Sequence, residues 1–313
     1  MKGKGCLFTV LGGLSGVLIL MAVSYMLMDR EKLILSDETR ASLPGEFITL
    51  TDGVTHYHLD GPQDGPVVVL VHGFSVASYT WERNVPALTE AGFRVLSYDL
   101  FGRGYSDRPE GPYDLDLFIR QLDELLAALE IDQPVDLAGI SMGGYISSAF
   151  TNRFPDRVRR LVLLAPQSIA TGADQRVHIL VDPPYSDYLF TVYVLPFQLV
   201  EKKGEFKAFG LPDTWRENYL DMMQYVGFRS ALISTLRTMQ GDPFVEYRET
   251  GRLDVPVLLL WGDKDQTVPI EYAPDVLEAI PQAELHIIPG ARHASPYERP
   301  EEVNPLMIEF LRR

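Results

Sequence analysis

The stretch VDLAGISMGGYISSAF, residues 135–150, places a single serine, Ser141, between an apolar run and a run of small residues. The run before the serine is typical of a buried strand, and the run after it is typical of a helix. Gly139 and Gly143 flank the serine in the pattern G-x-S-x-G. In so tight a turn these glycines remove Cβ atoms that would clash, and the hydroxyl is pushed out at the carboxyl end of the strand. We therefore predict that Ser141 is a nucleophile rather than an ordinary turn residue.

Short apolar runs recur on both sides of this stretch, at residues 66–73, 93–99, 134–141, 160–166, 255–262 and 283–290. Near-continuous Val, Leu and Ile strands are covered on both faces of a sheet. Helix-period segments lie between them, and the alternation predicts an α/β fold with a doubly wound, mostly parallel sheet. Residues 47–60 alternate around Asp52 and Gly53, which predicts an antiparallel entry hairpin.

One connection is much longer than a crossover needs, because about eighty residues separate two strands between 168 and 252. This insertion is rich in aromatic and large apolar residues and has helical patches such as 213–226. We expect a mainly helical cap at 168–252 over an α/β core at 33–167 and 253–313. An apolar inner face would favour a lipidic or aromatic substrate. The alternative is that these side chains make only the insertion's own small core.

The amino terminus carries an uncharged run at residues 7–28. As a helix rising about 1.5 Å per residue, it reaches roughly the thickness of the hydrocarbon core of a bilayer. We expect residues 1–32 to form a transmembrane anchor with the body on the extracytoplasmic side. The alternative is a signal peptide cleaved at the small-x-small sequence 22–24, which would release a secreted protein.

Composition excludes several classes of function. The 28 basic and 43 acidic residues give a formal charge of −15, which argues against a nucleic-acid partner. The only cysteine, Cys6, cannot form an intramolecular disulfide and leaves the body without thiol catalysis or a cysteine-based metal site. We expect neither a metal nor an organic cofactor, and the sequence predicts no particular oligomeric state.

A nucleophilic serine needs a base to take its proton. Among six histidines, His293 lies in a loop just beyond the last predicted strand, where the carboxyl ends of the strands meet. The others lie in the entry hairpin, the first turn, the insertion or a strand, at His56, His58, His72, His178 and His286. We therefore predict that His293 is the general base.

The imidazole in turn needs a carboxylate that holds its tautomer. The turn after the strand at 255–262 carries Asp263 and Asp265, which the sequence does not separate cleanly. We assign the role to Asp265 and expect Asp263 to cap the turn. The chain order serine, aspartate, histidine is the order that accompanies this kind of serine turn.

The oxyanion of a tetrahedral intermediate needs hydrogen-bond donors. One is expected from the N–H of Met142, directly after the nucleophile, and the second from the N–H of Phe74, with Ser75 as the alternative. His72 is expected to brace this turn by hydrogen bonding. The loop at 99–109 is expected to be structural, with its geometry held by the side chains of Asp99, Arg103 and Ser106.

Five motifs in this order, LVHGFSVASYTW, YDLFGRGYSDRP, LAGISMGG, WGDKDQTVP and GARHASPYERP, resemble the α/β-hydrolase fold superfamily from about residue 47 to the end. The resemblance implies a capped hydrolase with its triad at Ser141, Asp265 and His293 and its oxyanion donors at Phe74 and Met142. Membrane-associated monoacylglycerol lipases are a looser likeness. Serine in place of aspartate at residue 141 disfavours the dehalogenases and epoxide hydrolases of the superfamily.

The function expected is hydrolysis of a small-molecule carboxylic ester with an apolar acyl part. One alternative is carbon–carbon bond hydrolysis of ring-cleavage products, which is disfavoured because Ala294 stands where that group often has tryptophan. The same triad also permits a perhydrolase or haloperoxidase-like activity. A non-catalytic binding module is an alternative of another class, although such proteins usually lose a triad member.

Overall fold

The computed structural model of the protein describes residues 2–168, 185–199 and 213–313. The strands are β1 (Glu46–Leu50), β2 (Gly53–Asp60), β3 (Val67–Val71), β4 (Arg94–Tyr98), β5 (Val135–Ile140), β6 (Val158–Leu164), β7 (Val257–Gly262) and β8 (Ala283–Ile288). The α-helices are α1 (Lys2–Met28), α2 (Asp37–Arg40), α3 (Val85–Glu90), α4 (Leu115–Ala128), α5 (Met142–Arg153), α7 (Ser186–Leu189), α9 (Asp213–Met222), α10 (Phe228–Thr238), α11 (Phe244–Thr250), α12 (Ala273–Ala279), α13 (Ser295–Glu298) and α14 (Pro300–Leu311). The 3₁₀ turns are η1 (Ser78–Trp81), η2 (Pro155–Arg157) and η4 (Ile270–Tyr272), and η3 (Phe190–Val194) is a π-helical turn.

The strands form one sheet of eight in the order β1-β2-β4-β3-β5-β6-β7-β8. β2 is antiparallel to both of its neighbours, and the strands from β4 to β8 are parallel. This confirms the predicted mostly parallel sheet with an antiparallel entry hairpin. Because β5, β7 and β8 run in the same direction, the loops that follow them leave from one edge of the sheet.

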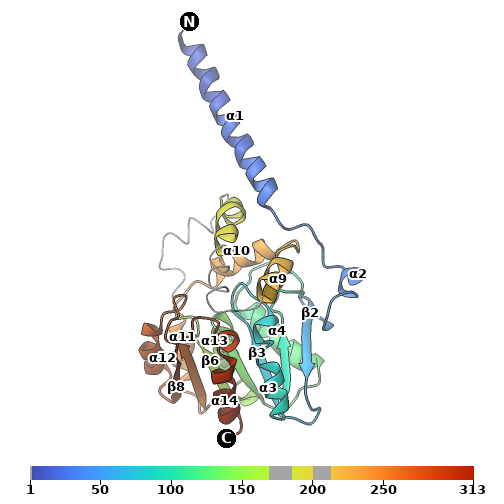
Figure 1. The fold of residues 1–313 in the computed structure, drawn as a ribbon, viewed down its shortest axis with the longest axis vertical. Coiled ribbons are helices and arrows are strands. Elements are labelled where there is room, and N and C mark those ends of the chain that lie inside the picture. Colours follow the sequence, from blue (N-terminus) through green and yellow to red (C-terminus); the bar gives the residue numbers. More distant parts are fainter. Residues whose placement is uncertain (1, 169–184, 200–212) are drawn as a thin grey trace.

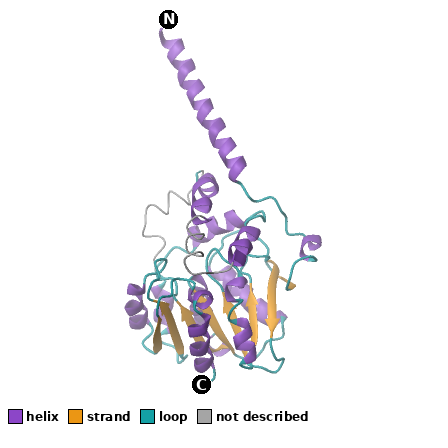
Figure 2. Cartoon of the chain, in the orientation of Figure 1, coloured by secondary structure: helices purple, strands orange, loops and turns teal. Residues whose placement is uncertain are grey.

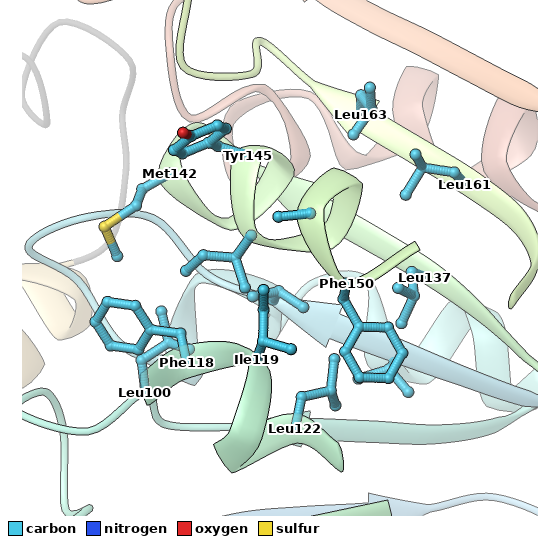
Figure 3. Packing of buried hydrophobic residues seen from close by; sticks show 14 of the residues in the cluster. Leu100, Phe118, Ile119, Leu122, Leu137, Met142, Tyr145, Phe150, Leu161 and Leu163 are labelled. Atoms are coloured by element: carbon cyan, nitrogen blue, oxygen red, sulfur yellow. The ribbon is translucent and has the colours of Figure 1, made fainter. Parts of the chain in front are cut away.

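Burial on both faces follows from the two-residue period of the strands. In β3, Val69 and Val71 join the core on one face, while Val68 and Leu70 join the core on the other. The first core is closed by α4, α5, α11 and α12, and the second by α3 and α14. Figure 2 shows helices on both sides of the strands, and Figure 3 shows α4 and α5 side chains packed over β5 and β6. The sheet is thus a rigid platform for the loops at its edge.

Helix α4 illustrates how the sequence sets these elements. Asp114 precedes the helix with an extended backbone, and its side chain accepts a hydrogen bond from the Leu117 N–H at 3.0 Å. Such an N-cap satisfies one of the four amide groups that a helix start leaves unpaired. The apolar residues spaced three and four apart then face the sheet, and Phe118 and Leu122 are fully buried.

The insertion between β6 and β7 is helical in its described part, with α7, η3, α9, α10 and α11. Residues 169–184, which include His178, and residues 200–212 lie outside the described residues. Figure 1 shows α9 and α10 between the sheet and α1. A separate apolar cluster joins these helices to the loop after β3, through residues such as Tyr219, Phe228 and Ala77.

Helix α1 extends away from the body (Figure 1). Its described side chains are Gly13 and residues 15–28. In the described part of the chain, no helix combines the length and the apolar character that crossing a membrane requires. The transmembrane helix expected within residues 1–32 therefore has no support from the structure.

The carboxyl end of α1 is tied to the insertion by polar contacts. The guanidinium of Arg229, on α10, contacts Asp29 at 3.0 Å, Asp187 at 2.6 Å and the Tyr25 hydroxyl at 2.8 Å. Arg229 is only 8% exposed, and these partners flank the junction between α1 and the insertion. Burial lowers the pKa of Arg229, but the surrounding carboxylates outweigh it and raise that pKa. The segment after α1 is thus anchored on α10.

Candidate active site

The turn at Ser141 has the strained geometry that its sequence suggests. Ser141 has φ 56° and ψ −122°, a conformation that side-chain-bearing residues rarely adopt. A Cβ atom at Gly139 would lie 2.3 Å from the Gly143 carbonyl oxygen, and one at Gly143 would lie 2.2 Å from the Val71 carbonyl oxygen. Only glycine fits at both positions, so the motif is required for this close approach of β5, α5 and the end of β3.

The start of α5 and the turn after β3 meet at Ser141. Met142 is the first residue of α5, and the first N–H groups of a helix have no acceptor within the helix. Gly73, in the turn after β3, lies so close that a Cβ atom there would be 3.5 Å from the Ser141 Cβ. The peptide that carries the Phe74 N–H therefore lies beside the serine. The helix dipole of α5 adds positive potential at the same place.

His72 braces this turn from inside the protein. Its Nε2 accepts a hydrogen bond from the Leu100 N–H at 2.9 Å, so its proton resides on Nδ1. Nδ1 donates to the Gly73 carbonyl oxygen at 2.8 Å. Complete burial lowers the pKa of His72 to about 4, against the pull of Asp99, and keeps the ring neutral near pH 7. The ring is thus a fixed support for the Gly73–Phe74 peptide and not a proton carrier.

The structure brings Asp265 and His293 together at the edge where β7 and β8 end. The Asp265 Oδ2 atom lies 2.8 Å from Nδ1 of His293. The other carboxylate oxygen accepts from the N–H groups of Thr267 and Val268 at 2.8 and 2.9 Å. The Asp265 side chain is fully buried, whereas that of His293 is 23% exposed. An acceptor held in this way directs Nδ1–H toward itself and leaves Nε2 with a lone pair.

Asp263, the other carboxylate of that turn, has a different position. Its Oδ1 accepts from the Gly290 N–H at 2.6 Å, which joins the turn after β7 to the turn after β8. A Cβ atom at Gly262 would lie 2.4 Å from the Ala291 carbonyl oxygen, so the two loops are also in backbone contact. Asp263 therefore holds the loop that leads to His293, and Asp265 contacts the imidazole.

The loop at 99–109, which follows β4 and is called the rim loop below, is organised by one buried carboxylate. Asp99 accepts from the N–H groups of Ser78 and Tyr105, each at 2.8 Å, and lies 2.7 Å from Nδ1 of His56. Burial opposes the charge on Asp99, but His56 and the hydrogen bonds outweigh it and hold the pKa of Asp99 well below its usual range. Burial likewise lowers the pKa of His56, yet the carboxylate raises it overall. Sequence reasoning gave His56 no partner, because His56 lies on β2 and Asp99 lies in the loop after β4, 43 residues along the chain.

Arg103 of the same loop is fully buried and reaches further than the loop itself. Its Nε donates to the Phe74 carbonyl oxygen at 2.8 Å, and its Nη2 donates to Oγ1 of Thr235 on α10 at 2.8 Å. The sequence suggested only that Arg103 holds loop geometry. A signal was available in the run GRGYSDRP, since a lone arginine between glycines after a buried strand must find partners or reach solvent.

A cavity of about 520 Å³ lies over β2 and β4 and contains none of the predicted triad. His58, Tyr79, Tyr105 and Met222 are among the residues that line it. Within the described ranges, no group of three or more His, Cys, Asp or Glu side chains is arranged to hold a metal ion.

Comparison with known proteins agrees with the fold. The family model described as the alpha/beta hydrolase family matches residues 68–306. A Synechocystis sp. protein with the provisional name of non-heme chloroperoxidase is 31% identical over 264 residues, which are 79% of this chain and 91% of that protein. A 2-hydroxy-6-oxononadienedioate/2-hydroxy-6-oxononatrienedioate hydrolase from Cupriavidus pinatubonensis is 28% identical, over 85% of this chain and 94% of its own.

Among solved structures, a bromoperoxidase from Bacillus anthracis superposes with a TM-score of 0.73 and 26% identity, over 86% of this chain and 100% of its own. The match of the family model spans most of the chain and includes β5, the turn at Ser141 and the loop of His293. The chain belongs to the alpha/beta hydrolase family.

Proposed function

We propose that the protein is a serine hydrolase that cleaves carboxylic esters through an acyl-enzyme. The observation that carries the proposal is the 2.8 Å contact between buried Asp265 and His293, on the sheet edge where Ser141 stands in a strained turn. Two backbone N–H groups already satisfy one oxygen of the Asp265 carboxylate, and the other oxygen is left to hold His293. A histidine oriented by a buried carboxylate in this way is what removal of a serine proton requires.

In the proposed reaction, Nε2 of His293 takes the proton from the Ser141 hydroxyl as its oxygen attacks the ester carbonyl. The carbonyl oxygen becomes an oxyanion and accepts hydrogen bonds from the N–H groups of Phe74 and Met142. The imidazolium, stabilised by Asp265, then gives its proton to the leaving alcohol. Water repeats these steps on the acyl-enzyme and releases the carboxylic acid.

An apolar acyl group is the substrate class that the surroundings favour. The turn that carries Phe74 packs against an apolar cluster built largely from the insertion, with Tyr219, Met222 and Phe228 among its buried members. An ester with an apolar acyl part would lie against the partly buried members of this cluster, such as Phe74 and Val76. We propose that the insertion is a cap that covers this part of the substrate.

The test is labelling by a fluorophosphonate, which reacts with an activated serine. Wild type is expected to be labelled, and the Ser141→Ala and His293→Ala variants are expected to lose both labelling and turnover of p-nitrophenyl esters to similar extents, because triad members act as a unit. A panel of esters of increasing acyl length then defines the acyl group. Labelling that persists in Ser141→Ala would show that another residue reacts with the fluorophosphonate and that Ser141 is not the nucleophile.

A second candidate function is perhydrolysis, in which hydrogen peroxide in place of water attacks the acyl-enzyme and releases a peracid. The relative from Synechocystis sp. with the provisional chloroperoxidase name favours this possibility. Halide oxidation in the presence of acetate and hydrogen peroxide measures it. Turnover of a vinylogous diketone, as an arm of the same panel, tests carbon–carbon hydrolysis, and the Cupriavidus pinatubonensis relative is named for a 2-hydroxy-6-oxo dienedioate substrate of this kind.

We further propose that the amino-terminal helix attaches the protein to a membrane, with the body on the extracytoplasmic side. The support is the uncharged run at residues 7–28. An alkaline carbonate wash of membranes, followed by protease protection, tests both the attachment and the side. Recovery of a soluble protein that begins after residue 24 would establish the alternative of a cleaved signal peptide and secretion.

A further inference from the structure

Arg103 is a buried cation whose nearest polar partners are not acidic. Its guanidinium donates to the carbonyl oxygens of Phe74 and Phe101, at 2.8 and 3.1 Å, and to the Thr235 hydroxyl at 2.8 Å. Among the described residues, no carboxylate forms an ion pair with it. Burial lowers its pKa but leaves it cationic near pH 7. A buried charge without a counter-charge is costly, and these hydrogen bonds offset that cost together with the rings of Phe74, Tyr113 and Phe118, which lie against the guanidinium.

The first of these bonds completes the support of the turn at Gly73 and Phe74, called the oxyanion turn here because the Phe74 N–H is an expected oxyanion donor. The Gly73 carbonyl oxygen is held by His72, and the Phe74 carbonyl oxygen is held by Arg103. The peptide groups on both sides of the Phe74 Cα are therefore fixed, which sets the direction of the Phe74 N–H. The guanidinium also lies 5.5 Å from the centre of the Phe74 ring, so it holds the side chain as well.

The third bond connects this support to the insertion. The Thr235 hydroxyl donates its own proton to the Ala231 carbonyl oxygen at 2.8 Å, so a lone pair faces Arg103. One turn earlier, the Ala231 side chain lies against Gly102, where an added Cβ atom would be 2.4 Å from the Ala231 Cβ. The rim loop thus packs closely against α10, and the Arg103 side chain connects α10 to the oxyanion turn.

We propose that Arg103 is a positioning residue for the oxyanion hole and that its bond to Thr235 makes the alignment of the Phe74 N–H depend on α10 being docked. This inference rests on the proposed function, since it concerns how the ester oxyanion is stabilised. A transition-state contact is sensitive to small errors of alignment, whereas binding of the substrate's apolar part is not. The insertion then contributes to the chemical step as well as to binding.

The experiment uses Thr235→Val, which keeps the shape of the side chain and removes the hydroxyl. Thr191→Val is the matched control, because Thr191 is also 2% exposed, also lies in the insertion and also donates to the carbonyl oxygen four residues earlier, without contacting Arg103. Thr235→Ser restores the hydroxyl. The full-length variants are compared on a p-nitrophenyl ester, a boronic acid that forms a tetrahedral adduct on serine, and an ether analogue without a carbonyl.

Thr235→Val is expected to lower kcat/KM by about 10-fold and to weaken boronic acid binding by the same factor. Binding of the ether analogue is expected to change by less than about 2-fold, and Thr235→Ser and Thr191→Val to stay within about 2-fold of wild type on every measure. Arg103→Lys, which keeps the charge but lacks the planar fork, is expected to lose at least as much.

Two results would overturn the inference while leaving the proposed function intact. One is wild-type kcat/KM and boronic acid affinity in Thr235→Val. The other is an equal loss of affinity for the boronic acid and for the ether, which would mean that the hydroxyl serves the packing of the insertion alone. Wild type that turns over no ester and binds no boronic acid would instead refute the proposed function, and the inference with it.

Discussion

Replacement of Asp265 by asparagine tests how the structure sets the tautomer of His293. One oxygen of Asp265 accepts two backbone hydrogen bonds, from Thr267 and Val268, and only the amide oxygen of asparagine can replace it there. The amide NH₂ group must then face Nδ1 of His293. A donor at that place favours the tautomer with its proton on Nε2, which removes the lone pair that would accept the proton of Ser141.

The size of the effect follows from this arrangement. Rotating the asparagine amide to present its oxygen to His293 would sacrifice both backbone bonds, so the wrong tautomer is held. Loss of the correct tautomer in a triad lowers kcat by about 10⁴-fold. That corresponds to about 5 kcal/mol of activation free energy. Folding should be little affected, because the asparagine keeps the shape of the side chain and both of its backbone hydrogen bonds.

The assay is kcat on a p-nitrophenyl ester, with the melting temperature measured alongside. Asp263→Asn is the matched control, because Asp263 lies in the same turn but accepts from the Gly290 N–H and not from His293. Its kcat is expected to fall by less than about 10-fold. The reasoning is refuted if Asp265→Asn keeps more than about a tenth of wild-type kcat, or if both variants lose activity equally.

The remaining predictions concern stability. Gly143→Ala would bring a Cβ atom to 2.2 Å from the Val71 carbonyl oxygen and is expected to cost about 3 kcal/mol in urea unfolding, while Gly16→Ala, where the added Cβ meets no described atom outside its own helix within 4 Å, should not be destabilising. Protonated His56 has a raised pKa, so its stabilisation is complete below about pH 6.5 and is lost as pH rises through the raised value. The difference in melting temperature between wild type and His56→Gln should shrink from about pH 5 to about pH 9, and a difference that grows would contradict this. Arg229→Met leaves partly buried Asp29 and half-exposed Asp187 without their cation and should destabilise the protein by about 1 kcal/mol, seen as faster proteolysis of the insertion; unchanged proteolysis would count against the contact.

Patterns within short segments were enough to predict the sheet and the strand-to-helix turn. The six predicted parallel-type strands coincide with β3 to β8, each within about two residues at either end. The run LDLFIRQLDELLAALE at 115–130, whose apolar residues recur at spacings of three and four, contains α4. These elements can be predicted because burial of a strand or of one helix face requires apolar residues at a regular spacing, which does not depend on distant partners. The G-x-S-x-G turn can be predicted for a similar reason, since its steric requirement is local.

The chain alone also determined which loops carry candidate chemistry, because carboxyl ends of parallel strands share one edge of a sheet. Tertiary structure decided what those residues touch. Only the fold shows that Asp265 and not Asp263 contacts His293 and that His56 pairs with Asp99. Contacts such as that between Arg103 and Thr235 join positions 132 residues apart in the chain. No local period records such a pair, because its energy depends on the distance and direction of two side chains after the sheet and the insertion have packed.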